Sequence, residues 1–161
     1  MTCIAKPFRM QDYQLLAERN MEPDVVLGDD LVGVARQMEA AGPAFTIWDH
    51  KTPILCAGAI VIWTGTAQMW MLANGDIPAR TRARAIVEVG QSLFQLGTER
   101  HRLTCVMAYV RVGYGAVAFL KRMAFQRVGL ISHYMPNDDD VVLWVWNKTN
   151  GPCGRSSRTT T

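Results

Sequence analysis

The sequence predicts a single α+β domain in which helices pack on a central, mostly antiparallel sheet. Short apolar runs typical of strands alternate with stretches whose apolar residues recur at helical spacing. The chain has 161 residues, which suits one domain with one core. Hydrophobic residues make up 49% of it, which indicates a globular rather than a disordered chain. The domain is expected to span residues 1–147.

The first part of the chain predicts one strand followed by two helices. The run CIAKPF is strand-like, and Asp12 can cap a short helix after it. MEPDVVLGDD is rich in turn residues and predicts a loop, at whose end Asp29 or Asp30 can cap a second helix. The apolar face of that second helix is Leu31, Val34, Ala35 and Met38.

Three strands are expected next, and then a long helix. AFTIWDH and PILCAGAIVIW flank a turn at residues 49–51 and predict a hairpin, and AQMWMLA predicts the third strand. The helix covers about residues 78–97, and Arg84 and Glu88 can pair on it at i,i+4. Its expected inner face is Ala79, Ala83, Ile86, Val87, Gly90, Leu93, Phe94 and Gly97.

The last part predicts a strand, a helix and two more strands. RLTCVMAYV is typical of a buried strand, and residues 114–123 follow a helical pattern. The strands FQRVGLISHYM and VVLWVWN are joined by the polar turn PNDDD. VVLWVWN is apolar on both faces, so it is either buried or covered by a partner, and a homodimer through that edge is a hypothesis.

Charge and composition exclude several classes of protein. The net charge is +3, but three of the bases lie in the polar tail, residues 148–161, which is expected to be disordered. Residues 1–147 therefore carry 14 bases and 14 acids, and this neutral domain does not favour a nucleic-acid partner. The longest apolar runs are shorter than the ~20 residues of a membrane helix, so no membrane partner is expected.

The cysteines and histidines do not indicate a metal site. The four cysteines are not at metal-ligand spacing, and three of them lie in strand-like runs, where a cysteine is usually a small buried hydrophobe. The three histidines are scattered and are interpreted as surface or structural residues. The N-terminus has no apolar core of a secretory signal, so a reducing, cytoplasmic location is expected.

The stretch GDIPARTRARA, residues 75–85, is the main candidate for a binding site. It can be a phosphate-binding turn, a nucleic-acid patch or the solvated start of a helix. Arginines at a helix N-terminus oppose the helix dipole unless an anion is bound, which favours the phosphate interpretation. Asp76 argues against it, because its carboxylate can cap the same N–H groups that a phosphate would use.

The order of the elements, over about residues 2–147, resembles the GNAT family of acyltransferases. In that family a strand leads into a turn of pattern Q/R-x-x-G-x-G/A and a long helix, and the turn holds the pyrophosphate of acetyl-CoA. Here the strand is AQMWMLA and the turn is R-x-x-A-x-A, with Ala83 in place of the first glycine. The resemblance implies pyrophosphate contacts at Arg80, Thr81, Arg82, Ala83, Arg84 and Ala85, and pantetheine contacts at Met71, Leu72 and Ala73.

A second motif, GYGAVAFLKRMAF, resembles the late helix of the same family, roughly N-x-x-A-x-x-x-Y-x-x-x-G-F. Ala116 and Phe125 match that pattern, but Leu120 stands where the family has the tyrosine that protonates the leaving thiolate. The central strands also hold no Asp or Glu that could act as a family-type base. Tyr114, Tyr109 and His133 are therefore candidates for the catalytic groups.

The resemblance implies transfer of an acyl group from acetyl-CoA, as co-substrate, to an amine on a small molecule or a protein. The acidic segments MEPDVVLGDD and PNDDD would suit a cationic acceptor. The alternative is a non-catalytic binding or structural protein of the same fold. The segment AFLKRMAF is also similar to GNAT-like proteins of tailed phages, and under this alternative the protein would reside in a phage particle.

Overall fold

A computed structural model describes residues 3–19, 30–112, 116–135 and 138–149. The order of its elements is the predicted one, so the expected α+β architecture is confirmed. The strands are β1 (Cys3–Pro7), β2 (Ala44–Asp49), β3 (Thr52–Trp63), β4 (Thr66–Ala73), β5 (Cys105–Arg111), β6 (Gln126–Ile131) and β7 (Val141–Asn147). The helices are α1 (Met10–Ala17), α2 (Leu31–Ala40), α3 (Ala79–Ala85), a π-helical turn (Ile86–Gly90), α4 (Gln91–Arg100) and α5 (Ala116–Arg122).

The strands form one sheet in the order β1-β2-β3-β4-β5-β7-β6. Every neighbouring pair is antiparallel except β4 and β5, which are parallel because the long helix between them carries the chain back to the same end of the sheet. The strand β7 lies between β5 and β6, so both of its hydrogen-bonding edges are paired, and its side chains are buried or half-buried. Of the two predicted alternatives, the buried strand is therefore the one found, and β6 forms the edge of the sheet instead.

The first two helices begin at different kinds of cap. Helix α1 has Arg9 as its N-cap, not Asp12 as predicted, because Asp12 lies in the first turn. The Asp12 carboxylate accepts hydrogen bonds from the Arg9 N–H (3.2 Å) and the Thr46 hydroxyl (2.6 Å), and so ties α1 to β2. Helix α2 begins at Asp30, whose carboxylate accepts from Gly33 N–H, as predicted. The rest of the predicted loop lies outside the described residues.

The long helix of residues 79–100 consists of α3, the π-helical turn and α4 without a break. The inner face predicted for its first turn was wrong: Ala79 and Ala83 are exposed, and Ala85 is fully buried. The alternation of alanine and arginine in this turn cannot show which alanine faces the sheet. From Ile86 onward the predicted inner face is confirmed at Gly90 and Phe94, which face the core.

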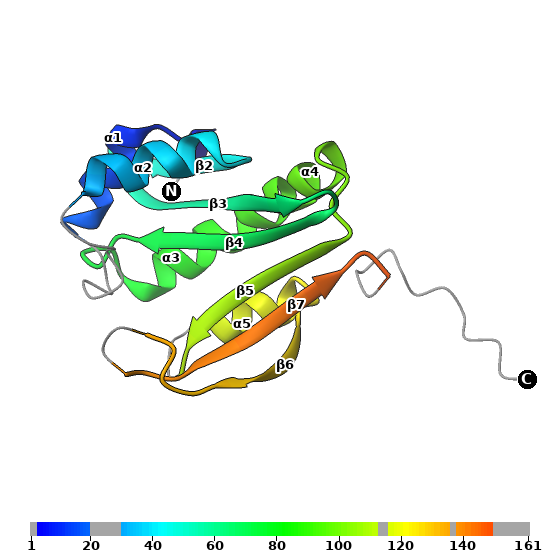
Figure 1. Cartoon of the computed structure of the whole chain (residues 1–161). Helices are drawn as coiled ribbons and strands as arrows, with labels where there is room; N and C mark the ends of the chain where they lie inside the picture. Colours follow the sequence, from blue (N-terminus) through cyan, green and yellow to red (C-terminus); the bar gives the residue numbers. More distant parts are fainter. Residues whose placement is uncertain (1–2, 20–29, 113–115, 136–137, 150–161) are drawn as a thin grey trace, which may run out of the picture.

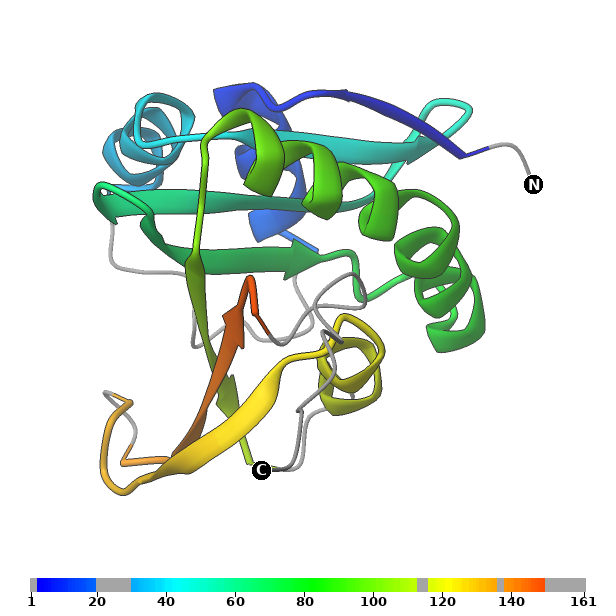
Figure 2. The same ribbon diagram turned by 90° about the vertical axis from the view of Figure 1, so that its right-hand side faces the viewer.

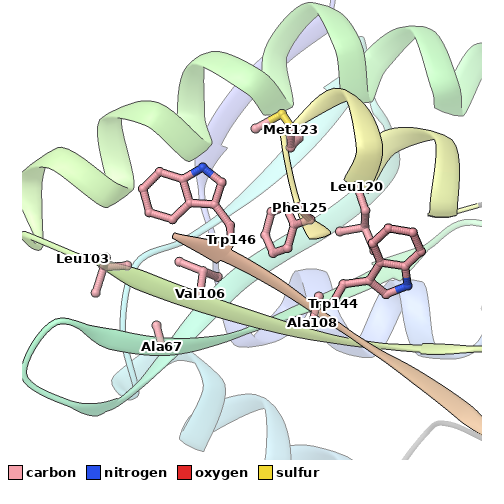
Figure 3. Packing of buried hydrophobic residues seen from close by; sticks show 9 residues of the cluster. All are labelled: Ala67, Leu103, Val106, Ala108, Leu120, Met123, Phe125, Trp144 and Trp146. Atoms are coloured by element: carbon pink, nitrogen blue, oxygen red, sulfur yellow. The ribbon is translucent and has the colours of Figure 1, made fainter. Parts of the chain in front are cut away.

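Side chains alternate between the two faces of the sheet, and each face has its own core. Helices α1 and α2 cover one face, where Leu16 and Ala35 pack on Cys56 and Leu72. The long helix covers the other face over β2 and β3, and α5 continues this layer over β5 and β7. Figure 3 shows the part under α5, in which Leu120 and Phe125 meet Trp144 and Trp146.

Within the described ranges, no helix is long and apolar enough to cross a membrane. The predicted boundary at residue 147 coincides with the end of β7. Residues 150–161, most of the predicted tail, lie outside the part of the chain that the structure describes.

Candidate functional site

The two parallel strands at the middle of the sheet separate partway along their length. The pairs between β4 and β5 run from Thr66 opposite Cys105 to Met69 opposite Ala108, and then stop. Beyond that point β4 stays on β3 and β5 stays on β7, so the two strands diverge (Figures 1 and 2). We call the space between residues 70–73 of β4 and residues 109–111 of β5 the strand opening.

Backbone N–H groups of β4 point into the strand opening. Asn74 N–H donates to the Ile54 carbonyl of β3 at 2.9 Å, and hydrogen bonds of an antiparallel ladder alternate along the strand. Trp70 and Leu72 therefore direct their N–H groups to β3. Met71 and Ala73 direct theirs away from β3, toward the strand opening. The predicted strand thus offers two hydrogen-bond donors where its neighbour has moved away.

The start of the long helix lies at the open end of these strands, as does α5 (Figure 2). Pro78 is the N-cap, and the first turn holds no acidic side chain. The predicted competition from Asp76 is not found, because its carboxylate lies 3.9 Å from the Arg19 guanidinium and does not cap the helix. The N–H groups of Ala79 and Arg80 belong to the helix positions that have no intrahelical acceptor.

The remaining backbone N–H groups of the predicted turn donate hydrogen bonds within the helix. Thr81 and Arg82 N–H both donate to the Pro78 carbonyl, at 2.9 and 3.1 Å. Ala83, Arg84 and Ala85 follow within α3, where N–H groups bond to the preceding turn. Among residues 79–85, the backbone N–H groups without an acceptor in the helix are therefore those of Ala79 and Arg80, and Arg80 belongs to the six predicted contact residues.

The three arginines of this stretch have three different environments. Arg80 is exposed, and Arg84 is exposed and paired with Glu88, as predicted. Arg82 is half-buried, and its Nη1 donates to the carbonyls of Asn74, Gly75 and Ile77. Arg82 therefore holds the loop between β4 and α3 in shape, and Arg80 is the arginine at the helix start that is open to solvent.

The loop held by Arg82 is also fixed from the other side by Asn74, which is fully buried. The Asn74 amide donates to the Pro53 carbonyl at 2.9 Å and its oxygen accepts from Asp76 N–H at 3.0 Å. The sequence analysis did not single out Asn74. An asparagine directly after an apolar strand and before a glycine is the sequence signal that could have identified it.

Polar side chains gather on the β5 side of the strand opening. The ring of Tyr109 stacks on that of Tyr134, with centroids 5.2 Å apart and planes inclined by 3°. Arg111, two residues further along β5, forms an ion pair with Asp139. Tyr134 N–H donates to the Asp139 carbonyl at 3.2 Å within the loop after β6, and the Tyr109 and Arg111 contacts bind this loop to β5. We call Tyr109, Arg111, Tyr134 and Asp139 the tyrosine–aspartate cluster.

His133 lies next to this cluster on the exposed side. Its ring Nδ1 is 2.8 Å from the Asp138 carboxylate, and its backbone N–H donates to the Asp140 carboxylate at 3.1 Å. The structure thus brings two predicted catalytic candidates, Tyr109 and His133, to the same end of the molecule. The third candidate, Tyr114, lies outside the described residues.

Two residues near the strand opening fill other roles than the family pattern would suggest. Leu120 is 1% exposed and packs in the core under α5, so this position offers no proton donor (Figure 3). Trp144 of β7 pairs with Ala108 of β5, the last residue of β5 that pairs with β4. Its indole N–H is buried and has no hydrogen-bond partner among the described residues. It is therefore a donor that the sequence analysis missed.

An apolar cavity of about 80 Å³ lies between the sheet and the long helix. It extends from Phe45 and Ile47 of β2 to Met71 of β4, and α5 contributes Phe119 to its wall. Among the described residues that line it, Thr98 has the one polar side chain, and its hydroxyl donates to the Gln95 carbonyl at 2.9 Å. The cavity wall therefore presents hydrocarbon.

The buried thiol beside β4 is not equipped to act as a nucleophile. Burial raises the pKa of the Cys56 thiol, and the nearby Asp12 carboxylate raises that pKa further. Burial also raises the pKa of Tyr13 on the same face. Because the thiolate is the reactive form, Cys56 remains a neutral core residue at physiological pH. No group of three metal-ligating side chains occurs among the described residues.

Comparison with known proteins places the fold. No protein-family model matches the chain, and no curated protein matches it. A mutant of the spermidine N-acetyltransferase SpeG of Vibrio cholerae superposes with a TM-score of 0.72 at 13% identity, covering 91% of this chain and 94% of that one. The ribosomal-protein-S18-alanine N-acetyltransferase of Escherichia coli superposes with a TM-score of 0.69 at 11% identity, covering 99% of both chains.

A third similar structure, yncA from Salmonella typhimurium, contains its cofactor acetyl-CoA. It superposes with a TM-score of 0.70 at 9% identity, covering 91% of this chain and 94% of that one. These similarities show that the chain has the GNAT acyltransferase fold, as the element order and the two motifs predicted.

Proposed function

We propose that this protein is an N-acyltransferase that moves an acyl group from acetyl-CoA or a related acyl-CoA to an amine. The observation that carries the proposal is the strand opening, where Met71 and Ala73 direct N–H groups away from β3. A helix start without an acidic residue lies at the open end of the same strands. The acetyltransferases of this fold, one of them solved with acetyl-CoA, further support it.

The donor would lie along β4 with its pyrophosphate at the start of the long helix. The N–H groups of Ala79 and Arg80 and the exposed Arg80 guanidinium would receive the phosphates, assisted by the helix dipole. The thioester carbonyl would accept a hydrogen bond from Met71 N–H. That bond strengthens as negative charge develops on the oxygen during attack.

The chemistry would then be direct attack of a neutral amine on the thioester. Holding both reactants side by side supplies much of the rate enhancement in such a reaction. Tyr109 lies on β5 beside the strand opening and is the candidate group for proton transfer. Leu120 cannot serve in that role, since its side chain is apolar and buried.

The acceptor is proposed to be a cationic amine. The loop after β6 carries Asp138, Asp139 and Asp140, and Arg111 neutralises one of these carboxylates. The stacked rings of Tyr109 and Tyr134 lie beside them and could hold a cation by its attraction to aromatic faces. A screen in which neutral and cationic amines react equally well would contradict this assignment.

The non-catalytic alternative is a possible outcome of the same tests. It rests on Ala83 and Leu120, which replace family residues, and no feature of the strand opening favours it. The fold gives no support to the resemblance to phage proteins, which stays a prediction, as does the cytoplasmic location. A homodimer also remains a proposal, now through the exposed edge strand β6.

Calorimetric titration with acetyl-CoA and with CoA tests the proposal. We expect micromolar binding, weakened about tenfold or more in Arg80→Glu, because a charge reversal near a phosphate removes an attraction and adds a repulsion. Arg100→Glu, at the other end of the long helix, is the matched control and should bind like the wild type. No binding by the wild type would contradict the proposed function.

A further inference from the structure

We propose that the apolar cavity under the long helix receives the acyl chain of the donor, which is therefore a short saturated acyl-CoA longer than acetyl-CoA. This inference rests on the proposed function and specifies its donor. The cavity reaches Met71 of β4, Val106 of β5 and Phe119 of α5. Met71 belongs to the strand opening, where the thioester would lie, while Val106 lies opposite Ala67 in the paired part of β4 and β5.

Met71 connects the thioester position to the cavity. Its N–H points into the strand opening, while its side chain lines the cavity. The residue is 37% exposed, so it forms part of both the surface and the cavity wall. A thioester carbonyl bound to Met71 N–H has its acyl carbons beside the Met71 side chain, at the mouth of the cavity.

The interior of the cavity selects for a hydrocarbon chain. The lining holds no charged side chain, and the hydroxyl of Thr98 is already satisfied by Gln95. An acyl group that ends in a carboxylate would lose its hydration there without gaining a partner. The chemistry of the wall therefore excludes dicarboxylic acyl donors and favours saturated ones.

The size of the cavity sets the length of the chain. An engineered protein cavity of about 150 Å³ holds benzene, which has six carbon atoms. The cavity here, about 80 Å³, is roughly half that size and takes about three carbon atoms beyond an acetyl group. The inferred donor carries an unbranched chain of about five carbons.

Two glycines of the long helix, Gly90 and Gly97, line the cavity and place no side chain in it. A Cβ at Gly90 would lie 3.7 Å from Ile86 Cγ2 and 4.0 Å from Phe119 Cε2 of α5. A Cβ at Gly97 would meet no atom within 4 Å. Gly90 also closes the π-helical turn, a feature that often marks functional sites in helices.

The reaction is the same for every chain length. The amine nitrogen attacks the thioester carbonyl carbon, a C–N bond forms and the C–S bond breaks. CoA leaves as a thiolate and takes up one proton, and the nitrogen loses one proton. Chain length changes only the contacts that the acyl carbons make with the cavity wall.

The test is calorimetric titration of the full chain with CoA, acetyl-CoA, butanoyl-CoA and pentanoyl-CoA. Each buried methylene should tighten binding about fourfold, so pentanoyl-CoA should bind more than tenfold tighter than acetyl-CoA. Gly97→Leu should remove this gain, so that pentanoyl-CoA binds no tighter than acetyl-CoA to this variant. Ala59→Val, which narrows the cavity from β3, provides a second variant in case the first does not fold.

Ala118→Leu, at an exposed position of α5 outside the cavity, is the matched control and should keep the gain. If CoA and acetyl-CoA bind but longer chains bind no better, the acyl-chain inference is overturned and the proposed function stands. If the gain persists in both filled variants, the chain lies elsewhere and the inference is also overturned. If neither CoA nor any acyl-CoA binds, the proposed function fails and the inference fails with it.

Discussion

At the residue scale, Arg82 has a structural role, although it lies in a stretch that resembles a phosphate-binding site. Its guanidinium donates to three carbonyls of the loop before α3, those of Asn74, Gly75 and Ile77. Hydrogen bonds to charged groups contribute about 1.5–3 kcal/mol. We therefore expect Arg82→Ala to lower the free energy of unfolding by about 2 kcal/mol in urea titrations.

Arg84→Ala is the control for this prediction, since the Arg84–Glu88 pair is exposed and exposed ion pairs contribute little to stability. Equal losses in the two variants would contradict the role assigned to Arg82. The same pair of variants separates stability from binding, because Arg84 is in the predicted motif and yet has no contact with the loop carbonyls.

Cys56 makes stability depend on pH in the alkaline range. Burial raises the pKa of its thiol in the folded protein above the ordinary value of ~8.5. Above that ordinary value the unfolded chain loses the proton and the folded chain keeps it, so the stabilisation that is complete below this pH is lost as pH rises.

The expected loss is about 1.4 kcal/mol per pH unit for one proton. In urea titrations between about pH 9 and 10, the free energy of unfolding of Cys56→Ala should fall less steeply with pH than that of the wild type. Tyr13, whose pKa burial also raises, should still contribute at higher pH in both proteins. Identical slopes in the two proteins would show that the thiol ionises freely in the native state.

At the scale of the element, a glycine-to-alanine substitution is expected to have opposite effects on stability in two helices. A Cβ at Gly97 in α4 meets nothing within 4 Å, and alanine is favoured over glycine inside a helix by about 1 kcal/mol. A Cβ at Gly33 in α2 would lie 2.0 Å from Asp30 Oδ2, the atom group that caps the helix.

We therefore expect Gly97→Ala to raise the free energy of unfolding by about 1 kcal/mol and Gly33→Ala to lower it by about 1 kcal/mol, the typical contribution of an N-cap. Thermal denaturation of both variants checks the signs. A destabilised Gly97→Ala would mean that the space beside α4 is needed by the fold.

The elements also show which local features can be predicted from a sequence. The Asp30 cap was predictable because the residue precedes an apolar helical face and its side chain needs only a local partner. Asp12 was assigned wrongly because its second partner, Thr46, lies on a strand 34 residues away. The phase of α3 was not predictable, since its alternating alanines and arginines fit the sheet in more than one way.

At the scale of the whole molecule, the fold was predictable to a greater degree than the site. The spacing of strand-like and helical runs determines the order of elements, and short connections determine which strands pair. The resemblance implied pantetheine contacts along β4, but the strand opening itself was not predicted, because it depends on where Met69 and Ala108 cease to pair. The Tyr109–Tyr134 stack joins one residue of β5 to one residue of the loop after β6, and no sequence pattern relates them.

The last prediction concerns the outer edge of the sheet. The strand β6 has one neighbour, β7, and exposes Val128 (62%) and Leu130 (51%). A bulge between Arg127 and Gly129 and the charge on Arg127 protect one end of the strand from further pairing. The other end lacks such protection, so we expect two copies to pair through β6.

Sedimentation velocity at about 100 µM protein should then show a dimer, which corresponds to an affinity at least in that range. Leu130→Lys should give a monomer, because it places a charge on the pairing edge. Leu96→Lys is the matched control: Leu96 is 59% exposed on α4, away from β6, and its substitution should leave the dimer intact. A monomeric wild type at this concentration would show that the bulge and Arg127 suffice to keep the edge unpaired.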